Sequence, residues 1–143
     1  MIVRGGWEGH EPVTTTELFI PSLESAGFEL DIEDTPEIYA DGAAMSRYDL
    51  VVQCLSMGSA TADEVVGLRQ AVAAGVGFAG WHGGIVDFFR ASTDYLQMVG
   101  AQFASHSHAP EDRGRADVPT WRRIAITRCT SRRLVVIMQS RES

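Results

Sequence analysis

Histidine is the side chain in this sequence best suited to chemistry near neutral pH. The chain has four histidines, at positions 10, 82, 106 and 108. A neutral imidazole binds zinc and other late divalent ions, and two histidines in His-Ser-His order point to the same side of an extended segment. We therefore predict a divalent metal site, with zinc as the first candidate and with His10, His82 and His106 as ligands.

Two other interpretations of the histidines remain open. His82 or Asp87 can act as a general base on a bound substrate, and Asp87 or Glu11 can add a carboxylate to a metal site. Alternatively, loop histidines hydrogen-bond the backbone and hold it in place, since their spacing lacks the tight pattern of a known zinc motif. The predicted catalytic residues are His82 and Asp87.

Two tryptophans stand beside these histidines in the sequence. Trp7 precedes His10, and Trp81 precedes His82. An aromatic ring can cover the apolar face of a sugar, so we predict substrate contacts from both tryptophans, together with Glu11 and Gly83. The alternative is that each tryptophan packs over the backbone of neighbouring glycines.

Short apolar segments precede the candidate residues and predict the strands that position them. Residues 1–4, 49–55 and 76–79 are typical of strands, and the second and third are apolar on both faces, as in a central parallel sheet. The loops that follow these strands hold the candidate residues. Because the carboxyl ends of parallel strands lie along one edge of a sheet, and ligands bind there, the sequence predicts a small-molecule site at that edge.

Helix signals alternate with the strands. Thr61 and Glu64 form the pattern of a capping box, which predicts a helix that runs to Gly75. The other predicted elements are helices at 14–26 (with a kink at Pro21), 85–90 and 92–99, an edge strand at 28–33, and strands at 123–127 and 134–138. Strand–helix alternation of this kind predicts an α/β protein with a parallel sheet flanked by helices.

Composition narrows the class of protein. The 143 residues suit one domain, no apolar run is long enough to span a membrane, and the two cysteines form no disulfide framework, so we expect a cytoplasmic protein without a membrane partner. Residues 1–110 carry a net charge of −11, which argues against nucleic acid as a partner, whereas residues 111–143 carry +4. Cys54 lies in an apolar strand and is interpreted as a small buried hydrophobe, not as a nucleophile.

Several motifs, in this order, resemble the trehalose-utilisation (ThuA-like) family. They are Arg4-Gly-Gly-Trp-Glu-Gly-His-Glu-Pro12, Tyr48-Asp-Leu-Val-Val52, Gly80-Trp-His-Gly-Gly84 with Asp87, and Tyr95-Leu-Gln-Met-Val-Gly100 through Phe103 and His106. The resemblance covers residues 1–112. It implies a flavodoxin-like, class I glutamine amidotransferase-like α/β fold in three layers.

The resemblance also implies what the protein does. The family is tied to the use of trehalose and related disaccharides, and motif position implies that His10, Trp81, His82, Asp87 and His106 belong to its site. Amidotransferases of this fold carry a nucleophilic cysteine at the glycine turn, where this chain has Trp81-His82. An enzyme here would therefore process carbohydrate as a hydrolase or lyase without a cysteine nucleophile.

The chain departs from the family pattern after residue 112. Residues 113–143 are rich in arginine, and we interpret them as a divergent segment, the remainder of the same domain after truncation or a frame shift. Two alternatives to an enzyme follow, a non-catalytic sugar-binding or assembly module and an inactive fragment. A sheet edge left without its next strand would favour a homo-oligomer.

Overall fold

The computed structural model describes residues 1–104 and the strand backbones of 121–129 and 133–140. Its sheet has six strands. In spatial order they are β2 (Ile32–Glu33), β1 (Ile2–Gly6), β3 (Leu50–Ser56), β4 (Gly77–Trp81), β6 (Arg133–Ser140) and β5 (Trp121–Cys129). Every neighbouring pair is parallel except β5 with β6, which is antiparallel.

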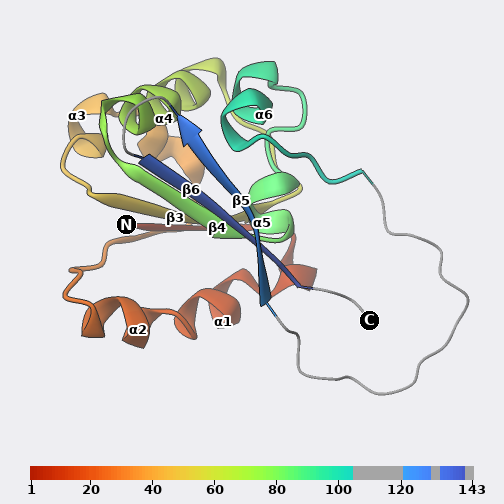
Figure 1. Ribbon diagram of the computed structural model, residues 1–143. Coiled ribbons are helices and arrows are strands. Elements are labelled where there is room, and N and C mark those ends of the chain that lie inside the picture. The colour runs from red at the N-terminus through yellow and green to blue at the C-terminus, as the bar shows by residue number, and fades with distance from the viewer. Residues whose placement is uncertain (105–120, 130–132, 141–143) are drawn as a thin grey trace, which may run out of the picture.

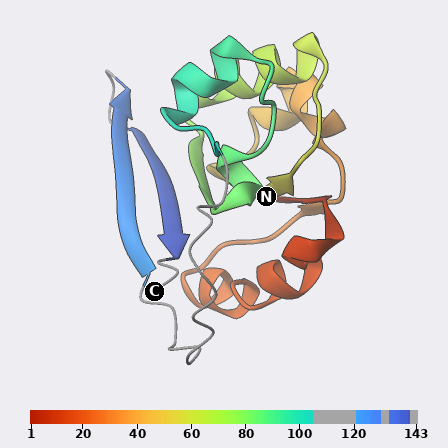
Figure 2. The same cartoon turned by 90° about the vertical axis from the view of Figure 1, so that its right-hand side faces the viewer.

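Helices cover both faces of this sheet, so the molecule has three layers. Helices α1 (Pro12–Glu17) and α2 (Ile20–Ser25) lie on one face, and α3 (Gly42–Met45), α4 (Ala62–Ala74) and α6 (Thr93–Val99) lie on the other (Figures 1 and 2). The one-turn helix α5 (Gly83–Val86) directly follows β4, and two 3-10 helices, η1 (Glu8–His10) and η2 (Pro36–Ala40), lie in connections. This architecture confirms the predicted α/β fold with a parallel sheet between helices.

Local sequence signals set the ends of two helices. The hydroxyl of Thr61 accepts from the Glu64 amide, and the Glu64 carboxylate accepts from the Thr61 amide at 2.7 Å, so the predicted capping box begins α4. Ser92 caps α6, and Gly100 ends it in the left-handed conformation with φ 76°. These ends were predictable because each depends on side chains within one turn of the helix terminus.

Three predicted elements were wrong in extent. The helix expected over 14–26 is divided into α1 and α2, because Pro21 is tolerated in the first turn of a new helix and not inside a continuous one. The edge strand expected over 28–33 shrinks to β2, where only Ile32 and Glu33 pair with β1. The helix expected over 85–90 ends at Val86, and Phe89 beyond it has φ 50°.

The two faces of the sheet bury different amounts of apolar surface. The larger core lies on the α4 and α6 side and includes Tyr39, Leu68, Phe78 and Val99, each 0% exposed. The smaller core lies under α1 and α2, and its buried members are Ile2, Val52, Cys54 and Trp81.

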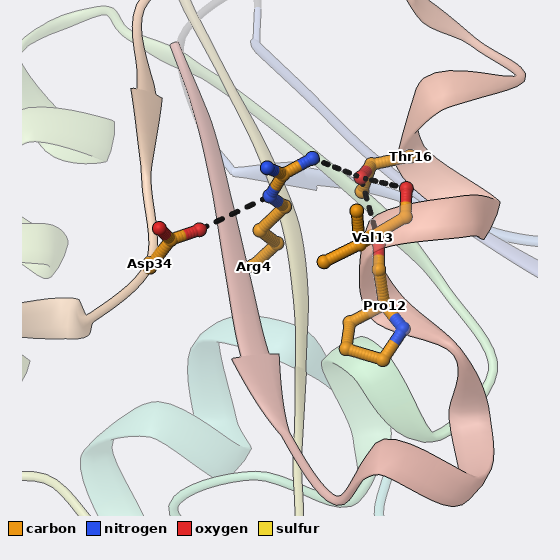
Figure 3. A network of polar contacts seen from close by, with 5 residues as sticks. All are labelled: Arg4, Pro12, Val13, Thr16 and Asp34. Carbon is orange, nitrogen blue, oxygen red and sulfur yellow. Dashed lines mark hydrogen bonds and ion pairs between the residues drawn. The ribbon is translucent and has the colours of Figure 1, made fainter.

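A polar network on the smaller side fastens β1 to its neighbours (Figure 3). The Arg4 guanidinium donates to Asp34 Oδ1 at 3.1 Å and to Thr16 Oγ1 at 3.3 Å. Thr16 in turn shares its hydroxyl hydrogen between the Pro12 and Val13 carbonyls. The side chain of Arg4 is 15% exposed, so this contact ties α1 to the sheet where apolar packing is sparse.

Within the part of the chain that the structure describes, no helix has both the length and the apolar character needed to cross a bilayer.

Candidate functional site

Three loops meet at the carboxyl edge of the sheet, after β1, β3 and β4. We call this edge the rim, made of residues 7–11, 57–60 and 82–90. The Trp7 amide donates to the Ser56 carbonyl at 3.1 Å, and the Met57 amide donates to the Asp87 carbonyl at 2.7 Å. Backbone hydrogen bonds therefore join the loop after β1 to the end of β3, and the loop after β3 to the loop after β4.

The rings of His10 and His82 meet on the rim. Their centroids lie 4.9 Å apart with the planes at 83°, an edge-to-face contact. Trp7 also makes an edge-to-face contact with His10, at 4.8 Å and 72°. Gly83 permits this arrangement, because a Cβ atom there would lie 2.6 Å from His10 Cε1. These imidazoles lie 72 positions apart in the sequence, and the sheet brings them together.

His82 adopts a conformation that L-residues rarely take. Its φ is 49° and its ψ is −146°, at the point where β4 turns into α5. Among the described residues, the non-glycine positions with positive φ are Glu11, Met57, His82 and Phe89, and all four lie on the rim. Such strain costs about 1–3 kcal/mol per residue and concentrates at functional sites, so its clustering here favours the rim as the site.

Asp87 is buried and paired. It is 3% exposed, and its carboxylate forms an ion pair with the Arg90 guanidinium. Arg90 also lies 5.7 Å above the ring of Phe103. The predicted general base is therefore held on the inner side of the rim by a cation that is itself about half exposed.

The two tryptophans have different surroundings. Trp7 is 51% exposed on the rim, whereas Trp81 is 7% exposed and stacks on Phe19 at a centroid distance of 4.6 Å. Trp81 thus belongs to the smaller core, where Phe19 covers its ring. The packing alternative describes Trp7 instead, because a Cβ atom on Gly9 would lie 2.3 Å from its ring. Glu11 is exposed and ends η1 in the left-handed conformation with φ 44°.

The predicted metal site is described only in part. His10 and His82 are in contact, and His106 lies outside the described residues, as does His108. In the described ranges no three His, Cys, Asp or Glu side chains are grouped closely enough to hold a metal ion. The three-histidine site stays a prediction.

Three buried polar residues beneath the rim were missed by sequence reasoning. Tyr39, Gln53 and Tyr95 are each 0% exposed, and both tyrosine hydroxyls are hydrogen-bonded to Gln53. Burial raises the pKa of both tyrosines well above the ordinary range, so their hydroxyls stay protonated. A signal was present, since Gln53 is polar within a strand that is otherwise apolar on both faces.

Cys54 behaves as the sequence predicted. It is 4% exposed in β3, and desolvation by burial raises the pKa of its thiol from 9.0 to about 11. A thiol that stays protonated is a poor nucleophile. Cys54 therefore does not supply the cysteine that amidotransferases of this fold use.

A cavity of about 390 Å³ lies at the opposite edge of the sheet, between α3, the C-terminal half of α4 and the start of β3. It shares no residue with the rim.

The chain is similar to known proteins in sequence and in structure. The sequence model of the ThuA family, described as trehalose utilisation, matches residues 1–138, and so extends past residue 112. A ThuA-like protein from Bacteroides uniformis has a similar structure, with a TM-score of 0.55 and 18% identity over 69% of this chain and 42% of that one. The present chain thus spans less than half the length of that relative, and the likeness bears on the fold alone. No curated protein sequence matches the chain.

Proposed function

Because the chain belongs to the ThuA (trehalose utilisation) family, we propose that its rim binds trehalose, a related disaccharide or a keto derivative of such a sugar. The observation that carries the proposal is the contact between His10 and His82 beside the half-exposed Trp7. An exposed indole next to two imidazoles offers an apolar surface and hydrogen-bonding groups to one ligand. This is the combination that a sugar ring, apolar on its faces and polar at its edges, requires.

Trp7 is the residue we assign to stacking. Met57, 60% exposed, lies on the neighbouring loop, and the Trp7 amide is bonded to the residue before it. We propose that both side chains contact the apolar face of the ligand. We leave Trp81 out of the ligand contacts, because Phe19 covers its ring.

His82 is the residue we assign to proton transfer. It stands at the strand-to-helix turn in a strained backbone conformation, and its ring contacts that of His10. A histidine at this point can take a proton from a sugar hydroxyl or give one to a leaving oxygen. Asp87 and Arg90 stabilise the loop on which His82 stands.

A divalent metal fits the same histidines. Two nitrogen ligands of one zinc ion stand about 3.4 Å apart, and ring centroids 4.9 Å apart allow that separation. We propose His10, His82 and His106 as the ligands, with Glu11 as a further oxygen donor. When bound, zinc would polarise a carbonyl or a water molecule.

One observation favours a second candidate, a non-catalytic sugar-binding module. Of the two predicted catalytic residues, Asp87 already pairs with Arg90 in a buried position. Asp87 would then not be available to assist His82 in acid–base chemistry, and binding without turnover would result.

Titration of the protein with trehalose and its 3-keto derivative, followed by calorimetry and product analysis, tests the proposal. Loss of the Trp7 stacking surface in Trp7→Ala should weaken binding about tenfold. Phe28→Ala, which removes an aromatic ring 38% exposed away from the rim, is the matched control and should bind normally. Folded protein that binds neither sugar would refute the proposal. Elemental analysis of wild type and His82→Ala separates a metal-assisted enzyme from a binding module.

A further inference from the structure

A buried chain of side-chain hydrogen bonds runs directly beneath the turn that carries His82. Gln53, on the central strand β3, is its middle member. The Tyr39 hydroxyl donates to Gln53 Oε1 at 3.0 Å. Gln53 Nε2 donates to the Tyr95 hydroxyl at 2.7 Å and to the Gly84 carbonyl at 3.0 Å. The Tyr95 hydroxyl donates onward to the Ile85 carbonyl at 2.8 Å.

This chain has a fixed direction. Because Tyr39 donates to the amide oxygen of Gln53, the amide nitrogen must face Tyr95 and Gly84, and both of its hydrogens are used there. The Tyr95 oxygen accepts one of them, and its own hydrogen is directed to Ile85. Burial raises the pKa of both tyrosines, which keeps both hydroxyls available as donors.

The recipients are carbonyls that α5 cannot satisfy by itself. A helix of one turn leaves its last carbonyls without helical partners. Here Gly84 O accepts from Gln53, Ile85 O from Tyr95, Val86 O from the Phe103 amide, and Asp87 O from the Met57 amide. Donors from outside α5 thus fix four successive carbonyls, the first of which lies two residues after His82.

We propose that Gln53 and Tyr95 are positioning residues that hold His82 in its strained conformation. A residue at φ 49° and ψ −146° persists only where its surroundings over-determine it. The amides of Ile85 and Val86 both donate to the His82 carbonyl, so fixing the carbonyls of Gly84 and Ile85 fixes that turn as a unit. An effect on sugar affinity rests in addition on the function proposed above, whereas an effect on the His82 turn does not.

Tyr95→Phe and Tyr39→Phe form a matched pair for the test. Each removes one hydroxyl from a fully buried ring bonded to Gln53, but only Tyr95 donates to α5. Amide hydrogen exchange of residues 85–87, the NMR shifts of the His82 backbone and ring, and sugar affinity are measured in both. We expect exchange of these amides to quicken about fivefold more in Tyr95→Phe than in Tyr39→Phe, with displaced His82 signals and unchanged exchange in α4.

Gln53→Met extends the test, since it removes both donors at once and should disturb the His82 signals more strongly. If Gln53→Met fails to fold, the comparison of Tyr95→Phe with Tyr39→Phe still tests the positioning role. Equal exchange in the two tyrosine variants, or His82 signals unmoved in Tyr95→Phe, would overturn the positioning role. Displaced His82 signals in a protein whose wild type binds no sugar would support the positioning role and refute the proposed function alone.

Discussion

Cys54 and Gly84 illustrate how closely single residues fit beneath the rim. A Cβ atom on Gly84 would lie 3.3 Å from the Cys54 sulfur, so the thiol has no room for solvent on that side. The same burial raises the pKa of the thiol to about 11. At the residue scale, burial keeps the Cys54 thiol protonated and unreactive, and Cys54 packs closely against the glycine turn.

The pKa of Cys54 predicts how stability changes in alkaline solution. In the unfolded chain the thiol loses its proton near its ordinary pKa of 9.0, whereas in the folded protein it keeps the proton until about pH 11. Between these values the folded state binds more protons, so the free energy of unfolding falls as pH rises from 9 to 11. Below pH 9 this contribution is fully present.

Urea unfolding at intervals from pH 8 to pH 11 measures that fall, with Cys54→Ala as the comparison. The variant should show a shallower decline. Part of the decline will remain in the variant, because burial also raises the pKa of Tyr39 and Tyr95. If the free energy of unfolding fell equally with pH in wild type and Cys54→Ala, the raised pKa of the Cys54 thiol would be contradicted.

Helix α5 and strand β3 approach each other at the level of the backbone. A Cβ atom on Gly84 would come within 2.9 Å of Cys54 Cα, and on the neighbouring strand β4 a Cβ atom on Gly80 would come within 2.6 Å of the Gln53 carbonyl oxygen. At the element scale, these glycines allow α5 to lie close enough to β3 for the Gln53 side chain to hydrogen-bond to it. The close approach and the hydrogen-bond chain therefore depend on each other.

Gly84→Ala tests that close approach. The added methyl group meets backbone atoms that cannot rotate away, so we expect it to lower the free energy of unfolding by about 1–3 kcal/mol. Gly42→Ala is the control, since nothing lies within 4 Å of a Cβ atom at that helical position and alanine favours helix. Chemical denaturation compares the two. A Gly84→Ala protein as stable as Gly42→Ala would show that β3 and α5 leave room for a methyl group between them.

The molecule as a whole is built of two unequal layers around its sheet. Helix α4 has six buried residues, four of which belong to the larger core, whereas no residue of α2 is buried. Leu18, between α1 and α2, is 73% exposed. Apolar burial is the main stabilising term in folding, so the two layers should differ in local stability.

We predict that the α1–α2 layer opens before the rest of the protein. Native-state hydrogen exchange should show residues 20–27 exchanging at least about a hundredfold faster than the buried amides of α4. The Arg4 network anchors α1 and should slow its exchange relative to α2. Exchange in α2 as slow as in α4 would contradict this ranking.

The sequence by itself determined the central strands β1, β3 and β4, the capped helices α4 and α6, the parallel sheet and the edge where the rim loops gather. Each of these follows from apolar runs, capping residues and glycines that act over a few neighbouring positions. The strand segments at 123–127 and 134–138 fall inside β5 and β6 for the same reason. The metal site, the sugar contacts and the division at residue 112 stay predictions.

Only the tertiary structure decided what the individual rim residues do. Trp81 stacks on Phe19, Asp87 pairs with Arg90, and the Gln53 amide donates to the Gly84 carbonyl. These contacts arise from the way the chain folds around the sheet. The short extent of α5 has the same origin, because donors from other segments replace the helical bonds that would have continued it. Local patterns cannot encode such contacts, since they exist only once the sheet has brought its loops to one edge.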